Sequence, residues 1–576
     1  MSKLTVLDVF CGAGGFSEGF RQQGFEILQG VDRWQPAIDT FNHNFGLECK
    51  VRDVLEFLES VDAIEALPET GIILGSPPCV SFSSSNISGK ADKSSGIALT
   101  RAFLRIVAVK KWKKASSLQA WFMENVPRSI GHLAKDYTFS DLGLGVWATA
   151  NGIDPGLSAV RLEGNRFVLN SAHYGCAQTR RRVITGEILA RQAMIIPETT
   201  HSEALESGKL PCKTLGSLRL NLPAPTTTDQ IRSIEDPNYP EIRIRPELLT
   251  DHFYDTGLYR CEWELSKYLK TNHPYMGKMS FPEDEDRPSR TITATKIGSS
   301  RESIVYRSEL IRVGDGEFRT ATVREAACVM GFPITYQFKG GEGTKWRLVG
   351  NAVCPGVSRA LARQVRFELG FEPTRQLVLE KEVNLDGVIN LNRKSRKVFN
   401  NPPQRKTNSR FRRHPFKDGN MTVTLSNYDI ETNVIHTDKW MTSVQYGTGT
   451  GFPSHAFPDW EHRKIEPIIR KQKNGAQFVE VINNGFSQKV STAIELQQAY
   501  ELRITSGHYL EPTELIEEVA RLINGLEIEG AIFSQEDNVV FMGKKNVPLK
   551  QLYALYAINR ITSIANKNTH GQEPKN

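Results

Sequence analysis

The sequence predicts an α/β protein built on a doubly wound, mostly parallel sheet. Four short apolar runs recur near the N-terminus, each followed by polar or glycine-rich residues: 4–10, 25–31, 71–74 and 120–123. Stretches compatible with helices lie between them, at 16–23, 36–44 and 99–114. Strands that alternate with helices form a parallel sheet covered by helices. We therefore expect a ligand site outside the carboxyl ends of these strands.

Composition sets broad limits on the class of protein. A chain of 576 residues is long enough for two or three domains. It contains no apolar run long enough to span a membrane, and its N-terminus lacks the pattern of a secretory signal, so we expect a cytoplasmic protein without membrane contact. The eight cysteines are scattered, with no Cys-x-x-Cys pair. This spacing argues against a disulfide framework and against a metal site, and leaves reduced thiols, one of which can be a nucleophile.

The first strand leads into a glycine cluster, Gly12, Gly14 and Gly15. Glycines let the backbone turn tightly and approach a ligand, and the spacing is not that of a nucleoside triphosphate loop. Asp32 ends the next strand, where it could accept hydrogen bonds from ribose hydroxyls. Asp53 lies where a third strand would end, and could accept from an adenine amino group. A nucleoside cofactor without a pyrophosphate fits this set, although either acid alone is more typical of a helix cap or a surface residue.

The third apolar run leads into Pro77-Pro78-Cys79. The two prolines fix the backbone and remove two amide donors, so the chain presents the thiol of Cys79 along a rigid path. A polar loop rich in Ser, Gly and Lys follows at 83–96, as expected for a cover that closes over a substrate. The pattern suggests a nucleophilic cysteine. On its own, however, a Pro-Cys pair is more typical of a buried structural cysteine.

Six blocks together resemble the C5-cytosine DNA methyltransferase family. Residues 8–17 (DVFCGAGGFS) look like its first motif, Pro77-Pro78-Cys79 like its nucleophile motif, and Glu124-Asn125-Val126 like the next catalytic motif. Residues 178–182 (QTRRR) match its Gln-x-Arg-x-Arg, and 287–292 and 350–353 are similar to its last two blocks. The blocks occur in the family's order over about residues 4 to 370. The resemblance implies a Rossmann-like fold that uses S-adenosylmethionine.

The resemblance also implies catalytic roles. Cys79 would add to C6 of a cytosine flipped out of the duplex, which makes C5 nucleophilic. Glu124 would hold N3 and the amino group of the base. Arg180 and Arg182 alternate on an extended segment, so they would point the same way and grip the pyrimidine O2 and a phosphate. Arg182 is also a candidate for lowering the pKa of the Cys79 thiol.

By the same resemblance, two further sets of residues are implied. S-adenosyl-L-methionine would be bound by Phe10, Gly12, Gly14, Asp32, Asp53, Pro78, Leu99, Asn351 and Val353. Substrate would be bound by Ser81, Ser83 and Gln178. Asp32 stands where many members of the family have Glu, which shortens the reach to the ribose. Leu99 corresponds to a Gly-x-Leu block, here Gly96-Ile97-Ala98-Leu99.

We expect five segments along the chain. They are a catalytic domain at 1–188, a target-recognition domain at 189–286, a return to the catalytic domain at 287–372, a basic linker at 373–420 and a C-terminal α+β domain at 421–576. Residues 252–278 interleave aromatic and basic side chains that could read DNA, although most of the aromatics could instead form the domain's own core. Ten Lys or Arg and no acid lie between 391 and 417, as in a segment that contacts a polyanion or in a solvated linker. In the last segment we expect strands within 421–451, helices at 513–526 and 549–565, and a hairpin at 531–542.

The leading hypothesis is a monomeric methyltransferase that modifies double-stranded DNA within a bacterial restriction–modification system, with a cognate endonuclease as the implied partner. A tRNA cytosine methyltransferase is an alternative with the same chemistry, but the long segment at 190–286 favours duplex DNA. A bifunctional methyltransferase–nuclease is another, with Asp459, Glu461 and Glu480 as acids; the lysine expected beside Glu480 is absent. An inactive DNA-binding regulator is disfavoured by Cys79, Glu124 and the glycine cluster.

Overall fold

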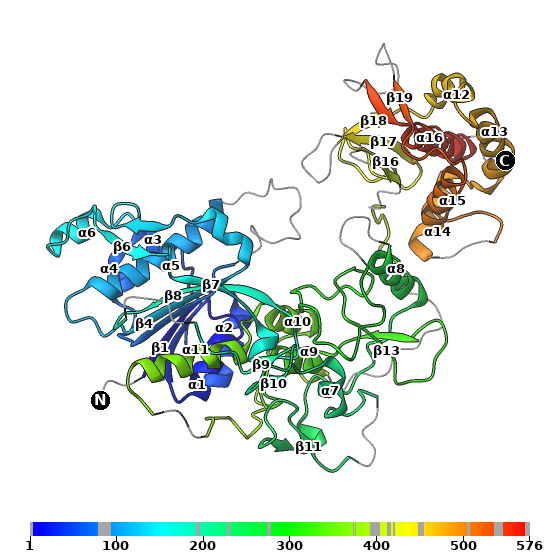
Figure 1. Ribbon diagram of the computed structural model, residues 1–576. Coiled ribbons are helices and arrows are strands. Elements are labelled where there is room, and N and C mark those ends of the chain that lie inside the picture. The colour runs from blue at the N-terminus through cyan, green and yellow to red at the C-terminus, as the bar shows by residue number, and fades with distance from the viewer. Residues whose placement is uncertain are drawn as a thin grey trace. The chain divides into compact units, whose positions relative to one another are not determined.

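The computed structural model describes thirteen segments of the chain. They are residues 4–78, 94–191, 196–226, 231–272, 278–372, 374, 376–391, 404–411, 416–418, 421–446, 454–503, 507–534 and 545–570. They belong to two compact units, with the division after residue 399. We describe each unit by itself (Figure 1).

A six-stranded sheet forms the centre of the first unit. Its order is β2-β1-β3-β4-β8-β7, with β1 (Thr5–Val9), β2 (Glu26–Val31), β3 (Ile72–Gly75), β4 (Ala120–Asn125), β7 (Arg166–Asn170) and β8 (Arg181–Ile188). The first four strands are parallel, and β8 is antiparallel to both β4 and β7. The four strands predicted from the apolar runs are therefore confirmed, as is the mostly parallel sheet.

Helices cover both faces of this sheet (Figure 1). One face packs on α1 (Gly15–Gln22) and α11 (Pro355–Glu368), and the other on α5 (Ser94–Trp112). Successive residues of a strand alternate between the faces: Ile72 and Leu74 join the first cluster, and Ile73 joins the second. Burial on both faces explains why these strands read as continuous apolar runs. The remaining elements around the sheet are α2 (Gln35–Phe45), α3 (Glu56–Glu59), α4 (Val61–Glu65), β5 (Asp136–Thr138), α6 (Gly145–Ala150) and β6 (Ser158–Arg161).

No strand ends at Asp53, so the third strand expected there is wrong. Residues 47–53 have no regular structure, although the N–H of Arg52 donates to the carbonyl of Asp32 at 3.0 Å. Strand β3 takes the place beside β1 instead. Because β1 lies between β2 and β3, the winding reverses there, and the N–H of Ser76 donates to the carbonyl of Val9 at 3.2 Å. Such a reversal opens the crevice in which α/β sheets bind ligands.

The chain returns to this crevice through α9 (Val323–Met330), α10 (Glu342–Asn351) and α11. Helix α11 crosses α1 so closely that a Cβ on Gly19 would lie 2.3 Å from the backbone nitrogen of Arg359. Residues 376–391 also belong to this unit, since the N–H of Val378 donates to the carbonyl of Gln22 at 3.0 Å and Lys345 donates to the carbonyl of Ile389 at 2.7 Å. The linker expected from residue 373 therefore does not begin there.

A smaller subregion of the first unit lies between β8 and α9. Helix α8 (Arg260–Thr271) and the hairpin of β13 (Val305–Arg307) and β14 (Phe318–Thr320) share a separate cluster of Leu258, Trp263, Val305 and Phe318, with Phe281 packed against it. This packing joins both sides of the boundary expected at 286. The other elements here are β9 (His201–Ser202), β10 (Leu210–Pro211), α7 (Leu215–Leu220), β11 (Ile234–Glu235) and β12 (Arg243–Ile244).

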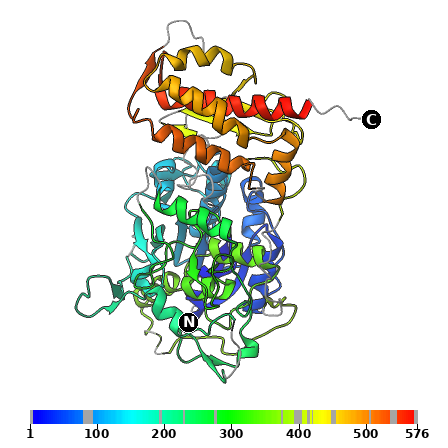
Figure 2. The ribbon, with the colours of Figure 1, turned by 90° about the vertical axis from the view of Figure 1, so that its right-hand side faces the viewer.

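The second unit is an α+β fold. The antiparallel strands β15 (Phe416–Asp418), β16 (Met421–Ser426), β17 (Met441–Tyr446) and β18 (Ser454–Phe457) pack against α16 (Leu549–His570), the long red helix in Figure 2. Around them lie α12 (His462–Arg470), α13 (Gly475–Glu480), α14 (Ala493–Leu502) and α15 (Pro512–Asn524). The helices expected at 513–526 and 549–565 are confirmed. The hairpin pairs β19 (Ile532–Ser534) with β20 (Asn546–Pro548), beyond the expected end at 542.

No described helix is long and apolar enough to cross a membrane. Within the same residues, no three side chains of His, Cys, Asp or Glu are grouped so that they could hold a metal ion. Of the acids considered for a nuclease, Asp459 accepts a hydrogen bond from Asn566 at 2.8 Å, and Glu480 pairs with Arg470 at 3.0 Å.

Candidate functional site

The glycine turn after β1 is shaped by positive φ angles. Phe10, Gly12 and Gly14 have φ values of 62°, 51° and 83°. A Cβ on Gly14 would overlap the ring of Phe45 at 2.6 Å and the hydroxyl of Tyr336 at 2.7 Å. A Cβ on Gly12 would have only the carbonyl oxygen of Phe10 near it, at 4.0 Å. Gly14 is thus required by packing, whereas Gly12 leaves open space in which a ligand can approach the backbone.

Asp32, at the end of β2, borders this space. Its Oδ2 accepts the N–H of Gly12 at 3.0 Å, and its Oδ1 accepts the N–H of Trp34 at 2.9 Å. Burial raises the pKa of this carboxyl, and the two N–H donors oppose that shift. Each carboxylate oxygen can accept a further hydrogen bond. Asp53 is exposed, with one oxygen accepting the N–H of Leu55 at 3.0 Å. An open glycine turn beside a carboxylate with spare acceptor sites fits a nucleoside.

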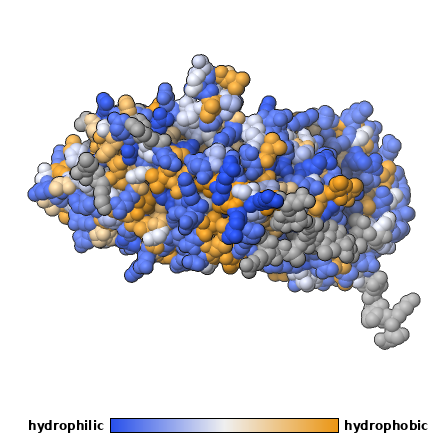
Figure 3. Space-filling view, turned by 90° about the horizontal axis from the view of Figure 1, so that it is seen from below, coloured by the Kyte–Doolittle hydropathy of each residue, from blue (hydrophilic) through white to orange (hydrophobic). Residues whose placement is uncertain are grey.

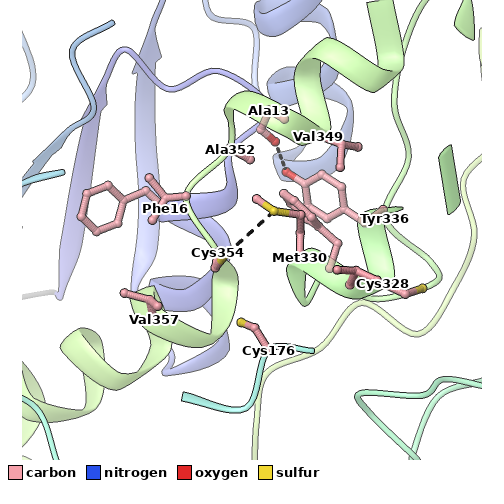
Figure 4. Close-up of a cluster of buried hydrophobic side chains, with 14 of the residues drawn as sticks. Ala13, Phe16, Cys176, Cys328, Met330, Tyr336, Val349, Ala352, Cys354 and Val357 are labelled. Carbon is pink, nitrogen blue, oxygen red and sulfur yellow. Dashed lines mark hydrogen bonds between the residues drawn. The ribbon is translucent and has the colours of Figure 1, made fainter. Parts of the chain in front are cut away.

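Residues far apart in the sequence complete this part of the site. A Cβ on Gly15 would lie 2.2 Å from the carbonyl oxygen of Val353, so the start of α1 touches the segment after α10. Figure 4 shows Ala13 and Phe16 gathered with Ala352 and Cys354. Val353 is buried and Asn351 is exposed. On the other side, Leu99 of α5 belongs to the same apolar cluster as Phe10.

The carboxyl end of β4 carries Glu124, which is paired with Arg182 of β8. The Nε of Arg182 lies 2.9 Å from Oε1 of Glu124, and the side chains are 16% and 11% exposed. Antiparallel pairing aligns Glu124 with Ile184, which brings Arg182 to the carboxyl end of β4. The next residue, Asn125, donates to the carbonyl of Pro77 at 3.4 Å. This contact ties the Pro77-Pro78 turn to Glu124.

Arg180 has a different environment from Arg182. Its guanidinium donates to the carbonyls of Ile292, Gly350 and Ala352 at 3.1, 3.1 and 3.2 Å. It is buried, at 4% exposure. Both arginines border one recess, as their alternation predicted. However, the contacts of Arg180 hold the chain segments around the recess together, so they favour a positioning role over direct contact with the base.

About 220 Å³ of space that no atoms occupy lies in and around this recess, open solvent included. It combines one acid and two cations with an apolar wall: Glu124, Leu169, Ser171, Arg180, Arg182, Ile184, Val353, Cys354 and Val357. This mixed lining offers a carboxylate and two guanidinium groups as hydrogen-bonding partners for a polar ring.

Gln178 is fully buried, and its side-chain amide lies 3.9 Å from the sulfur of Cys354, which lines the recess. Its side-chain oxygen accepts the N–H of Ile292 at 2.7 Å, and its backbone carbonyl accepts the hydroxyl of Ser171 at 2.7 Å. A side chain with these contacts orients its neighbours, so the structure does not favour the direct substrate contact expected of it. Pro78 is exposed. Cys79, Ser81 and Ser83 lie outside the described residues.

The sequence did not single out Cys354 and Ser171. The hydrogen bond with Cys176 lowers the pKa of the Cys354 thiol, and the charges of Arg180 and Arg182 add to this effect against the burial that opposes it. Cys354 directly follows Val353, so its place in the 350–353 block was the available signal. Nothing in the spacing of Ser171 distinguishes it from other serines of the chain.

Comparison with known proteins identifies the family. The model of the C-5 cytosine-specific DNA methylase family matches residues 4–366. The chain belongs to this family. It is a DNA (cytosine-5-)-methyltransferase, and it acts on DNA. The match ends within the first unit, so the second unit lies outside the family's shared part.

Two similar methyltransferases each match about two thirds of this chain. Type II methyltransferase M.HgiDI of Herpetosiphon aurantiacus is 27% identical over 389 residues, which are 65% of this chain and 98% of the relative. Type II methyltransferase M.NgoFVII of Neisseria gonorrhoeae is 27% identical over 397 residues, with 66% and 93% covered. A putative DNA modification methyltransferase encoded within an E. coli prophage has a solved structure that covers 64% of this chain and 99% of its own, at 20% identity and a TM-score of 0.41.

Proposed function

We propose that this methyltransferase transfers a methyl group from S-adenosyl-L-methionine to C5 of a cytosine within a specific double-stranded DNA sequence. It would protect host DNA as the modification enzyme of a restriction–modification system. The observation that carries the proposal is the Glu124–Arg182 pair that lines the recess, tied through Asn125 to the turn that leads to Cys79. The Type II relatives support the biological role.

The glycine turn after β1 would bind the methyl donor. When bound, S-adenosylmethionine supplies an electrophilic methyl group. Asp32 would accept hydrogen bonds from its ribose hydroxyls, and Asp53 from its adenine amino group. Phe10 and Leu99 would provide apolar contacts, with Gly12 leaving room for the ligand. The contact of Gly15 with Val353 would place Asn351 and Val353 over the same opening.

The recess would hold the target cytosine, and the Cys79 thiol would react with it. Cytosine C5 is a poor nucleophile, and addition of the Cys79 thiolate to C6 makes C5 nucleophilic. The Glu124 carboxyl would accept from the amino group of the base and would hold N3 as negative charge develops. Arg182 fixes the orientation of Glu124. A base within a duplex cannot reach this recess, so it must be flipped out of the helix.

A trapping experiment tests the proposal. Fluorine at C5 blocks the last elimination, so duplex DNA containing 5-fluorocytosine should form a covalent adduct in the presence of S-adenosylmethionine. Mass mapping should locate the adduct on Cys79, and the Cys79→Ser variant should form none. An adduct with RNA alone would identify an RNA methyltransferase. The absence of any adduct with the intact protein would contradict the covalent mechanism.

A further inference from the structure

Two apolar side chains protrude from the loop that joins β13 to β14. Ile311 and Val313 are 104% and 93% exposed. Exposed apolar residues also occur elsewhere, and Figure 3 shows hydrophobic residues between hydrophilic ones on the face that it draws. Val146 and Leu220, for example, are 89% and 87% exposed. Exposure alone therefore does not mark a site. What distinguishes this loop is the way it is held.

Buried polar contacts fix the loop on both sides of each protruding residue. Between the two, Arg312 pairs with the buried carboxylate of Asp255 at 2.7 Å. After Val313, the carbonyl of Gly314 accepts the indole N–H of Trp263 at 2.8 Å. Before Ile311, Glu309 pairs with the buried Arg319 at 2.6 Å. The loop thus presents Ile311 and Val313 from a fixed backbone, although neither contributes to a core.

The same loop contacts the start of α8. The Oδ1 of Asp315 accepts the N–H of Arg260 at 2.6 Å, and the N–H of Gly316 donates to the carbonyl of Leu258 at 2.7 Å. The inner face of α8 is anchored by Trp263 and Lys270. Lys270 is fully buried and pairs with Glu283 at 3.3 Å.

The solvent-exposed face of α8 is polar and extends from the loop along the helix. It carries Arg260, Glu264, Lys267 and Tyr268, at the spacing of one helix face. Tyr268 is 62% exposed. Helix and loop therefore form one continuous surface, mounted on the small cluster of Leu258, Trp263, Val305 and Phe318.

The cations of this surface extend further into solvent than their acidic partners. Arg260 is 68% exposed and its partner Glu264 is 48% exposed, while Arg307 is 70% exposed and its partner Glu317 is 24% exposed. Among the described residues, Lys267 forms no ion pair. A polyanion approaching the surface would meet guanidinium and ammonium groups first.

We propose that this surface, defined by Arg260, Lys267, Tyr268, Arg307, Ile311 and Val313, binds duplex DNA and reads part of the target sequence. The inference rests on the proposed function and identifies where the target is read. The major groove is about 12 Å wide and admits a helix or a two-stranded ribbon. Ile311 and Val313 contact apolar base edges such as thymine methyl groups, and the cations contact phosphates.

The first test selects duplexes from a randomised DNA pool with the purified full-length protein and sequences the bound fraction. Ile311→Ser with Val313→Ser should lower the preference at one or more positions of the selected motif by about tenfold or more. Leu220→Ser, an exposed apolar residue on α7, is the matched control and should leave the motif unchanged. An unchanged motif with the double variant would overturn the proposal.

A second arm measures how DNA affinity depends on salt. Lys267→Ala should weaken binding uniformly across sequences and reduce the salt slope by about 1, whereas the double serine variant should leave the slope unchanged. Normal slope and motif in both variants would make this surface a site for another partner. Selection measures binding without methyl transfer. A wild-type protein that selects a motif but forms no 5-methylcytosine would therefore contradict the proposed function. The same result would leave the proposal for this surface supported.

Discussion

Two arginines that look equivalent in the sequence differ in their contacts. Arg182 forms an ion pair with Glu124, whereas Arg180, which borders the same recess, donates to three backbone carbonyls. Loss of the first should affect chemistry, and loss of the second should affect stability. The reason is that buried carbonyls left without donors cost about 1–3 kcal/mol each.

We therefore expect two alanine substitutions to affect different properties, catalysis in one case and stability in the other. Arg182→Ala should lower kcat by about 100-fold or more, with a loss of stability well below that of Arg180→Ala. Arg180→Ala should lower the free energy of unfolding by about 3 kcal/mol or more. Thermal unfolding and single-turnover methyl transfer, measured on both variants, separate the two roles. Equal losses of stability would show that the distinction is wrong.

Asp8, in the middle of β1, gives the protein a dependence of stability on pH. It is fully buried, and Oδ2 accepts the hydroxyl of Ser17 at 2.6 Å. Burial raises the pKa of this carboxyl to about 7, from 3.8 for an unperturbed group. Between these values the folded state keeps a proton that the unfolded chain has lost. Stability from this group is therefore complete at low pH and is lost as the pH rises to about 7.

The Asp8→Asn variant removes this titration. Its stability relative to the wild type should rise by about 2–3 kcal/mol between pH 5 and pH 8, since one pKa unit corresponds to about 1.4 kcal/mol. Urea unfolding of both proteins at several pH values measures the difference, in which groups shared by the two proteins cancel. A constant difference across this range would show that Asp8 does not titrate there.

At the scale of elements, the crossing of α1 and α11 depends on a glycine. A Cβ on Gly19 would lie 2.3 Å from the nitrogen of Arg359 and 2.6 Å from the carbonyl oxygen of Pro355. Both atoms are backbone, so the helices would have to separate. Gly19→Ala should therefore destabilise the protein by about 1–3 kcal/mol, even though alanine favours helices by about 1 kcal/mol.

A second helical glycine provides the matched control. Gly343 in α10 is exposed, and a Cβ there would meet nothing within 4 Å. Gly343→Ala should raise the free energy of unfolding by up to about 1 kcal/mol through helix propensity alone. Chemical denaturation of both variants gives the comparison. A stabilising Gly19→Ala would mean that the helices do not cross this closely.

Part of the arrangement of helices and strands could be predicted from the sequence. Strands β1, β2, β3 and β4 were found because burial on both faces leaves a continuous apolar run. The glycine cluster and Glu124 were found because they follow strand ends. The contacts of Arg180 and the packing of residues 305–320 against α8 were missed, since both depend on contacts between segments distant in sequence. Helices α12 and α13 were missed where Pro467 and Gly475 interrupt the helical pattern.

At the scale of the whole molecule, the two units have separate cores. The apolar clusters of the first unit end at Leu391, and that of the second begins at Phe411. The last described segment of the first unit covers a buried ion pair. The Nζ of Lys345 lies 2.7 Å from Asp251, and both side chains are fully buried. The carbonyl of Ile389 accepts from Lys345, and the N–H of Leu391 donates to Asp251 at 3.2 Å.

The hydrogen bonds of Ile389 and Leu391 with the buried Lys345–Asp251 pair predict where the chain can be truncated. A fragment of residues 1–391 should unfold cooperatively and retain methyl transfer, because it keeps its clusters and the whole family match. A fragment of residues 1–372, which ends at the boundary expected from the sequence, loses partners of the buried pair. It should be less stable by about 2–4 kcal/mol. Calorimetry and methyl transfer on both fragments measure the difference. Equal stability would mean that residues 376–391 do not belong to the catalytic unit, and an inactive but folded 1–391 fragment would show that the second unit is needed for catalysis.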